Sequence, residues 1–266
     1  MKAPIVTLLT DFGTKDHYVA SMKGVILKVN PRCQVVDITH EVNPQDIAEG
    51  AFILANAYSY FPEGTVHLAV VDPEVGGKRN PLLIVTERYF FVGPDNGLFS
   101  LVLQREEIKE VYCLTKKRFF LREVSSTFHG RDLFSPVAGH LTLGVSPPSF
   151  GQKIDSWKTI GFPTPVLKPG RIEGQVIHID SFGNLITNIE GKQLNLFKKD
   201  QPFSIFIGRR QIKGIRKGYW DAIRGELVCL IGSAGFLEIA VREGDARRML
   251  KVRKGSCVEI RIDRKR

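Results

Sequence analysis

Three polar clusters in this sequence contain the residue types that acid–base and electrostatic chemistry require. The longest, Asp72–Arg79 (DPEVGGKR), has a carboxylate at one end and a guanidinium at the other. Thr10–Gly13 (TDFG) adds the carboxylate of Asp11, and Phe128–Asp132 (FHGRD) adds the imidazole of His129. In one cleft, these groups would provide a possible proton acceptor and fixed charges.

The first two clusters each follow a short apolar run that predicts a β-strand. Ile5–Leu9 precedes Asp11, Val66–Val71 precedes Asp72, and the third cluster opens an amphipathic segment. In parallel α/β sheets, ligands bind outside the carboxyl ends of the strands. We therefore expect the three clusters to face one crevice.

Each of these residues also has a purely structural interpretation. Asp11 could cap a helix that starts near Asp16, and Asp72 could pair with Arg79 to stiffen a glycine-rich turn. His129 could be a buried histidine with satisfied hydrogen bonds. The functional alternative for Asp11 is that its two oxygens accept hydrogen bonds from a ribose diol.

The hydropathy pattern divides the chain into two parts. Before about residue 145, strand and helix patterns alternate, which predicts an α/β fold class: a three-layer α/β/α domain with a mostly parallel sheet. After residue 170, closely spaced short strands without a long helix predict a smaller all-β, barrel-like domain. These strands are expected at Gly174–Ile179, Leu185–Ile189, Phe203–Ile207, Leu227–Ile231, Leu237–Val241 and Ser256–Ile262. We place the domains at 1–150 and 171–266, with a proline- and glycine-rich linker at 151–170.

Composition limits the class of protein. The 266 residues, 43% of them hydrophobic, suit one large or two modest globular domains. No apolar run approaches the roughly 20 residues that span a bilayer, and the first residues predict a strand rather than a secretory signal. The four cysteines form no C-x-x-C pair, which fits a cytoplasmic protein without zinc or disulfides.

The formal charge of +10 is concentrated near the C-terminus. Residues 201–266 carry 16 Lys/Arg and 7 Asp/Glu, a net charge of +9. A basic region can bind nucleic acid, but no aromatic-interleaved or recognition motif accompanies this one. We interpret it as a solvated basic surface.

Two C-terminal stretches combine turn residues with groups that can bind a ligand. Asp180–Asn188 (DSFGNLITN) contains a Gly-Asn hairpin signal next to Phe182. An aromatic face beside an amide suits adenine recognition, by stacking and by hydrogen bonds to the base edge. Gly232–Ala240 (GSAGFLEIA) is either a hairpin turn or a carboxylate-binding loop.

Six motifs in this sequence resemble those of the S-adenosyl-L-methionine (SAM) hydroxide adenosyltransferase family, the SAM hydrolases, which are related to fluorinase and chlorinase. In chain order they are TDFG at 10–13, VDPxVGGxR at 71–79, PDNG at 94–97, TFHGRDxFxP at 127–136, DxFGNxxTN at 180–188 and SxGxLEIA at 233–240. The resemblance implies an N-terminal α/β domain, a C-terminal barrel-like domain and a homotrimer with active sites between subunits. It implies attack of water or hydroxide on C5′ of SAM, giving adenosine and L-methionine without a metal or cofactor. Neither a membrane nor a nucleic-acid partner is implied.

The resemblance also assigns roles to residues. Asp72, Arg79 and His129 match the catalytic triad, and Asp11 matches the ribose-binding carboxylate. The other substrate-binding matches are Phe12, Asn96, Phe182, Asn184 and Tyr219 (the last three for adenine), Asp180 for the methionine ammonium, Ser233 for its carboxylate, and Glu238 and Val241 nearby. Glu74 departs from the family pattern, which usually has glycine there, and this puts the geometry of the turn beside Asp72 in question.

The physical chemistry agrees with this reaction. A sulfonium leaves without being protonated, so the site has to place a water in line with C5′ and remove its proton. His129 or Asp72 could accept that proton while Arg79 orients the water or stabilises hydroxide. Two other functions are considered: halide attack on the same carbon, against which the intact triad weighs, and a non-catalytic adenosine- or nucleic-acid-binding module.

Overall fold

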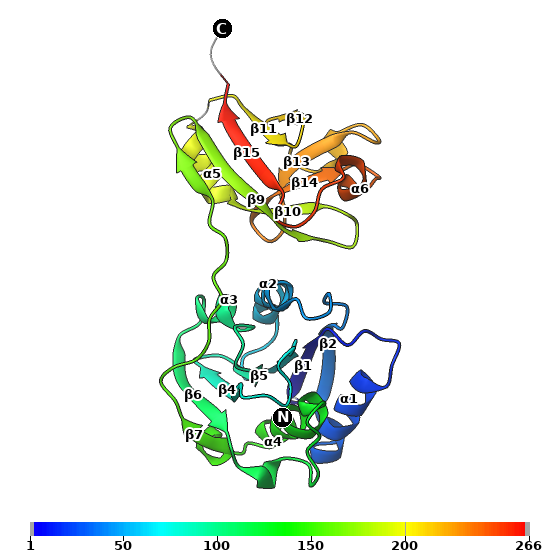
Figure 1. The fold of residues 1–266 in the computed structure, drawn as a ribbon, viewed down its shortest axis with the longest axis vertical. Coiled ribbons are helices and arrows are strands. Elements are labelled where there is room, and N and C mark those ends of the chain that lie inside the picture. Colours follow the sequence, from blue (N-terminus) through cyan, green and yellow to red (C-terminus); the bar gives the residue numbers. More distant parts are fainter. Residues whose placement is uncertain (1–2, 200, 264–266) are drawn as a thin grey trace. The chain divides into compact units, whose positions relative to one another are not determined.

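The computed structural model describes residues 3–199 and 201–263 and divides into two compact units, Met1–Gly161 and Phe162–Arg266 (Figure 1). The first unit is built on a seven-stranded sheet of order β2-β1-β3-β5-β4-β6-β7. Its strands are β1 (Ile5–Thr10), β2 (Gln34–Thr39), β3 (Val66–Val70), β4 (Pro81–Thr86), β5 (Phe90–Pro94), β6 (Ile108–Leu114) and β7 (Gly151–Lys153).

This sheet is mixed, so the expectation of a mostly parallel sheet is only partly right. The pairs β1–β2, β1–β3 and β3–β5 are parallel, whereas β4–β5, β4–β6 and β6–β7 are antiparallel. The reason is connection length. Only residues 87–89 join β4 to β5, whereas a parallel neighbour needs a crossover of about a dozen residues or more.

Helices cover both faces of this sheet (Figure 1). They are α1 (Tyr18–Val29), α2 (Ile47–Ala57), α3 (Ser100–Leu103) and α4 (Ser135–Thr142), with short turns η1 (Tyr58–Tyr60), η2 (Lys117–Phe119), η4 (Pro147–Phe150) and a π-helical turn η3 (Gly130–Phe134). Buried residues of α1 and α4 pack with β1 and β3 in one core cluster, while α2 lies against the other face. Helix α1 ends at Val29 before the Asn30-Pro31 pair, and Asp46 caps α2 by accepting a hydrogen bond from Glu49 N at 3.0 Å.

The second unit is an antiparallel sheet of order β12-β11-β15-β9-β10-β14-β13, with β8 beside β9. Its strands are β8 (Val166–Lys168), β9 (Arg171–Ile179), β10 (Leu185–Glu190), β11 (Phe203–Ile207), β12 (Arg210–Lys213), β13 (Leu227–Ile231), β14 (Phe236–Val241) and β15 (Cys257–Ile262). Alternate residues of these strands, on one face of the sheet, form one apolar core. The two edge strands approach each other, because Arg216 N, just after β12, donates to Cys229 O of β13 at 2.7 Å. The sheet is therefore nearly a closed barrel, as expected.

Two helices and a short turn interrupt these strands: α5 (Gly191–Lys198), α6 (Ala246–Leu250) and η5 (Tyr219–Asp221). We did not predict α5, which has eight residues. A capping box between Glu190 and Gln193 starts it, and Leu194 anchors it to the core. In the described part of the chain, no helix is long and apolar enough to cross a membrane.

Candidate active site

Arg79 joins the first and third polar clusters into one hydrogen-bonded group. Its Nε donates to both oxygens of Asp72, at 3.1 and 2.9 Å, and its Nη2 also donates to Asp72 Oδ2. The same Nη2 lies 2.8 Å from His129 Nδ1. The side chains of Asp72 and Arg79 are only 3% and 1% exposed, and the guanidinium lies over the ring of Phe134. Asp72, Arg79 and His129 therefore come together as predicted from their motifs.

The contact with Arg79 fixes the state of the His129 ring. A guanidinium can only donate, so His129 Nδ1 accepts and the proton of the neutral ring lies on Nε2. Burial, together with the positive charge of Arg79, lowers the pKa of His129 below its ordinary value of 6.5, although Asp72 and Asp132 oppose the shift. His129 is therefore neutral at pH 7 and is the partly exposed member of the group.

Backbone packing places the triad at the end of β3. Asn96 is buried and donates from Nδ2 to Val71 O at 2.7 Å, and this fixes the residue before Asp72. Gly76 has φ +75°, and a Cβ there would lie 2.1 Å from the Ser126 carbonyl oxygen. Only glycine allows this contact between the Asp72–Arg79 loop and the loop that leads to His129.

Glu74 lies on the outer side of this turn. Its carboxylate forms an exposed ion pair with Lys158 at 3.1 Å. The backbone φ angle of Glu74 is negative, as is usual for a residue with a side chain. The position that demands glycine is Gly76 rather than residue 74. The glutamate therefore fits the turn without strain.

Asp11 lies in the loop after β1 and does not cap a helix. The N-cap position of α1 is His17, and Asp11 Oδ2 accepts from Gln45 N at 2.8 Å, whereas Oδ1 has no hydrogen-bond partner among the described residues. Buried His40 supports this loop through two contacts. Its Nδ1 lies 2.8 Å from Thr10 Oγ1, and its carbonyl oxygen accepts a hydrogen bond from Gly13 N at 2.7 Å. One carboxylate oxygen of Asp11 is therefore available to a ligand hydroxyl.

Phe12 and Asn96, both expected to bind substrate, are largely occupied by the protein. Phe12 packs edge-on against Tyr18 and Phe128, at 5.9 and 5.7 Å between ring centroids. Asn96 Oδ1 accepts a hydrogen bond from Leu98 N at 3.2 Å, and Asn96 Nδ2 donates one to Val71 O. In this structure both residues support the loops that carry Asp11 and Asp72.

In the second unit, one cavity of about 860 Å³ collects all of the predicted residues. Predicted residues that line it are Asp180, Phe182, Asn184, Tyr219, Ser233, Glu238 and Val241. They come from the β9–β10 turn, from η5 and from β14 with the turn before it. Residues 60 positions apart in the sequence thus meet at one site.

Asp180 organises the aromatic wall of this cavity. Its Oδ1 accepts from the backbone N–H groups of Phe182 and Asn184, at 3.0 and 2.9 Å, and its Oδ2 accepts from Asn184 Nδ2 at 2.9 Å. These bonds tighten the turn so that Phe182 projects outward with 75% of its side chain exposed. An exposed phenylalanine held on a rigid turn is available for stacking.

Glu238 lies buried at the floor of the same cavity. It accepts a hydrogen bond from Tyr219 Oη at 2.5 Å, and Gly232 permits the close approach, since a Cβ there would lie 2.5 Å from Oε2. Burial raises the pKa of Glu238, and the negative charge of Asp180 adds to this, while the Tyr219 bond acts against it. Burial and the Glu238 bond also raise the pKa of Tyr219. Two neighbouring carboxylates make the cavity receptive to a cationic ligand.

Trp220 and Arg242 also line this cavity, although they were not predicted as site residues. Trp220 is 69% exposed, and Arg242 Nη1 donates to the Ala222 carbonyl at 2.6 Å, which holds the η5 segment. An available signal was the aromatic pair Tyr219-Trp220 directly after Gly218, because two adjacent aromatic residues in a turn rarely pack inward together. Within residues 3–199 and 201–263, no group of three His, Cys, Asp or Glu side chains could hold a metal ion.

The chain thus combines two features. Its α/β unit carries an Asp–Arg–His group, and its β unit carries an aromatic cavity lined by carboxylates. The comparisons with known proteins show which family has this combination. Two family models cover most of the chain. The SAM hydroxide adenosyltransferase N-terminal domain matches residues 6–151, and the C-terminal domain of the same family matches residues 174–259. The chain belongs to the SAM hydroxide adenosyltransferase family.

Individual relatives agree with this assignment. A protein of Methanocaldococcus jannaschii named (R)-S-adenosyl-L-methionine hydrolase is 38% identical, over 93% of this chain and 92% of its own length. One of the same name from Thermus thermophilus is 36% identical, over 96% and 98%. A fluorinase of an Actinoplanes species is 28% identical, over 72% and 73%. The crystal structure of an uncharacterized conserved protein from Thermotoga maritima superimposes with a TM-score of 0.89 at 38% identity, covering 96% of this chain and 99% of the other.

Proposed function

We propose that this protein hydrolyses SAM to adenosine and L-methionine through attack of water on C5′. The observation that carries the proposal is the Arg79 guanidinium, which bonds Asp72 on one side and His129 Nδ1 on the other. Relatives at 36–38% identity bear the name of this activity. Their name specifies the R configuration at sulfur, and we expect this protein to act on that epimer.

In this proposal the triad orients and polarises a water. The Arg79 bond leaves Nε2 as the nitrogen of His129 that is free to meet the water, and in this tautomer it donates to the attacking oxygen. A preorganised donor beside a buried guanidinium stabilises the charge of a hydroxide-like nucleophile. The sulfonium departs as a neutral thioether, so no acid is needed on the leaving-group side.

The same bonds bear on which triad member takes the proton. His129 can accept one only at Nδ1, which requires the bond from Arg79 to break. The Asp72 carboxylate keeps unused lone pairs while it is paired with Arg79. We therefore assign proton acceptance to Asp72 and the donor role to His129.

The second unit, in this proposal, supplies affinity. Phe182 stacks on adenine, with the Asn184 amide at the base edge and Tyr219 beside it. Asp180 and Glu238 face the cationic end of methionine, whose carboxylate meets Ser233, with Val241 against the chain. In the first unit Asp11 takes the ribose hydroxyls, while Phe12 and Asn96 hold the surrounding loops. The protein works as a homotrimer in the cytoplasm, and each site combines the first unit of one subunit with the second unit of a neighbour.

The test is incubation of purified protein with each SAM epimer, with adenosine and methionine measured by chromatography. Formation of both products in equal amounts supports hydrolysis, and the absence of adenosine above the blank contradicts it. Parallel reactions with chloride and fluoride address the halogenase alternative, since 5′-halogenated adenosine would replace adenosine there. Turnover should be unchanged by a chelator, because the proposal needs no metal.

Sharing of sites between subunits has its own test. Arg79→Ala and Phe182→Ala damage different units, so a refolded mixture of the two variants contains some sites in which both halves are intact. Turnover is compared at SAM concentrations below KM, where Phe182→Ala is expected to be slow, and regained turnover in the mixture supports shared sites. A mixture no more active than the average of the two variants places both halves within one subunit.

A further inference from the structure

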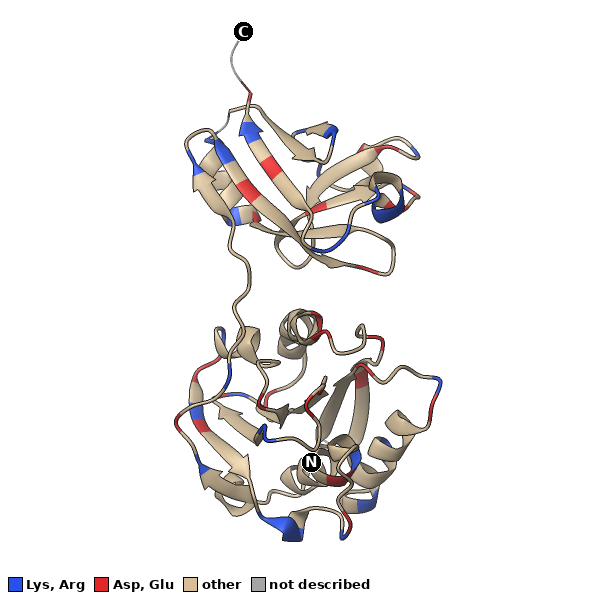
Figure 2. Ribbon diagram, in the orientation of Figure 1, with Lys and Arg blue, Asp and Glu red and all other residues tan. Residues whose placement is uncertain are grey.

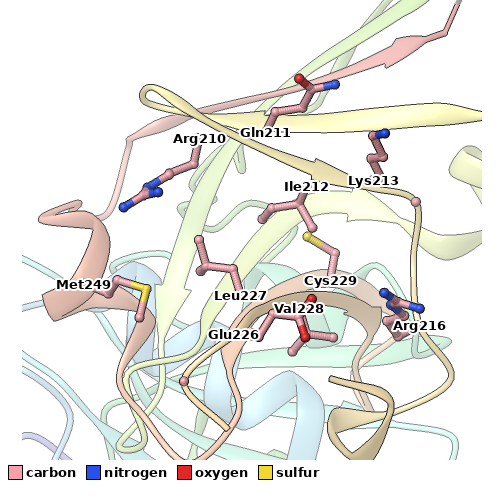
Figure 3. A pocket seen from close by; sticks show the side chains of 12 residues that line it. Arg210, Gln211, Ile212, Lys213, Arg216, Glu226, Leu227, Val228, Cys229 and Met249 are labelled. Carbon is pink, nitrogen blue, oxygen red and sulfur yellow. The ribbon is translucent and has the colours of Figure 1, made fainter. Parts of the chain in front are cut away.

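A second cavity of the β unit is distinct from the one described above. It has a volume of about 620 Å³ and lies between the edge strands β12 and β13 (Figure 3). Within the described chain, β12 pairs only with β11 and β13 only with β14. Each strand therefore turns an unpaired edge toward this cavity, which we call the seam groove. The backbone bond from Arg216 N to Cys229 O closes it at one end.

The seam groove is apolar in the middle and basic at its ends. In Figure 3, Ile212 of β12 points toward Leu227 and Cys229 of β13. Arg210 lies at one end of the groove beside Met249, and Lys213 and Arg216 lie toward the other end. The positive charges are spread along the groove instead of converging on one point. This arrangement fits an extended ligand better than a single phosphate.

These cations differ from others on the same sheet. On β9 and β15, Arg171 pairs with Glu173 at 3.0 Å and Arg261 pairs with Glu259 at 2.6 Å, and Figure 2 shows both charges along these strands. Among the described residues, Arg210, Lys213 and Arg216 have no carboxylate within ion-pair distance, although all three are exposed. Glu226 also lines the groove, but its Oε2 already accepts from Ile223 N at 2.8 Å.

The chemistry of the lining separates two kinds of polyanion. Proteins that bind single-stranded nucleic acid combine basic grooves with aromatic side chains on which bases stack. The seam groove has no aromatic side chain among its lining residues. It offers unpaired strand edges instead, which recognise an extended peptide by adding it to the sheet.

We propose that the seam groove binds an extended acidic segment of a partner protein, added as a strand at the β12 and β13 edges. Backbone groups of the segment pair with these edges, and its central apolar side chains rest on the half-buried side chains of Ile212 and Leu227. Carboxylates at its two ends meet Arg210 and the Lys213–Arg216 pair. None of these residues takes part in the proposed hydrolysis, so binding and turnover are separate properties.

The test uses the fluorescein-labelled peptide Glu-Glu-Val-Thr-Val-Thr-Glu-Glu and the full-length protein, with anisotropy as the readout. We expect saturable binding that weakens with salt and falls at least tenfold in Arg210→Glu/Lys213→Glu. The matched control Lys116→Glu/Lys192→Glu makes the same change in charge at exposed positions that do not line the groove and should bind as the wild type does. Replacing both valines with proline, which cannot donate to a strand edge, should abolish binding.

Several outcomes would overturn the proposal. One is that the proline peptide binds as tightly as the valine peptide. Another is that the two charge-reversed variants lose the same amount of peptide affinity. A third is that peptide binding to the wild type does not saturate. Tighter binding of labelled oligouridylate than of the peptide, lost in Arg210→Glu/Lys213→Glu, would assign the groove to RNA. A change of oligomeric state in that variant, measured by light scattering, would assign it to a contact between copies. SAM turnover by the same variants shows that each is folded.

Discussion

The candidate site residues of the two units differ in how complete their arrangement is without a ligand. In the first unit, Asp72 and Arg79 are buried and bonded to each other, and His129 is held by the same guanidinium. In the second unit, Phe182 is 75% exposed at the edge of an open cavity of about 860 Å³. The residues of the first unit are therefore preorganised, whereas those of the second unit surround a cavity that is open to a ligand.

This difference predicts a separation of kinetic effects. A preorganised group stabilises the transition state, so changes in the first unit should lower kcat. Groups that hold the substrate equally in ground and transition states should raise KM when removed. The variants below are ordered from the largest expected effect to the smallest.

Arg79→Ala should have the largest effect. It removes the cation from the triad and leaves Asp72 buried and unpaired, at a cost of about 3 kcal/mol in stability. We expect turnover to fall about 10³-fold, by analogy with the loss of a preorganised donor. Product formation and thermal unfolding are measured together. Arg79→Lys keeps the charge without the two-pronged geometry and should recover only part of the activity, so wild-type rates in either variant would contradict the assignment.

The second prediction concerns pH. Because the pKa of His129 is lowered, the ring is neutral at and above pH 6.5 and becomes protonated only as the pH falls further. A protonated ring donates from both nitrogens and loses the bond from Arg79, so kcat/KM should decline on the acid side below pH 6.5. His129→Asn should be slower, about 10²-fold, and lack this decline. His140, whose pKa is also lowered by burial, lies outside the triad, and His140→Asn should keep the decline.

Phe182→Ala tests the open half. We expect KM to rise up to about tenfold, since an aromatic stacking contact contributes up to about 1.5 kcal/mol, while kcat stays within twofold. The side chain is exposed, so the melting temperature should not change. A drop in kcat with constant KM would mean that the second unit also shapes the transition state.

His40 tests whether the Asp11 loop depends on its support. His40→Ala removes the buried contact with Thr10 and should raise KM about fivefold by loosening Asp11. His40→Gln keeps a polar group in reach of Thr10 Oγ1 and should restore much of the affinity. Equal defects in the two variants would indicate a general packing effect instead.

Glu74→Gly should have the smallest effect. The ion pair with Lys158 is exposed, and such pairs contribute less than about 1 kcal/mol. We expect both kinetic constants within twofold of the wild type. A larger change would show that the turn beside Asp72 is sensitive to this position after all.

The sequence was most informative where chemistry and local pattern coincide. Strands β1, β3, β11 and β13 lie within one residue of the predicted ranges because short apolar runs end in turn residues or polar clusters. The residues of the triad were predicted from their motifs and lie together. The residues predicted in the second unit line one cavity. In contrast, the β4–β5 antiparallel pair and α5 were not predicted, because pairing direction and an eight-residue helix depend on tertiary packing more than on local pattern.

Other details could not be inferred from the sequence at all. Whether His129 bonds through Nδ1 or Nε2 depends on where the buried Arg79 fork points, and no spacing encodes that. The positions of Phe12 and Asn96 illustrate a second limit. A motif places a residue near a site, but only packing shows whether its side chain faces the ligand or supports a neighbouring loop.

The most direct test of the account is hydrolysis of SAM in water enriched in ¹⁸O, with both products analysed by mass spectrometry. We expect one ¹⁸O atom in the 5′-hydroxyl of adenosine and none in methionine, with label incorporation slowed about 10³-fold in Arg79→Ala. Adenosine without label, or labelled adenosine formed equally fast by Arg79→Ala, would contradict a water held by the triad.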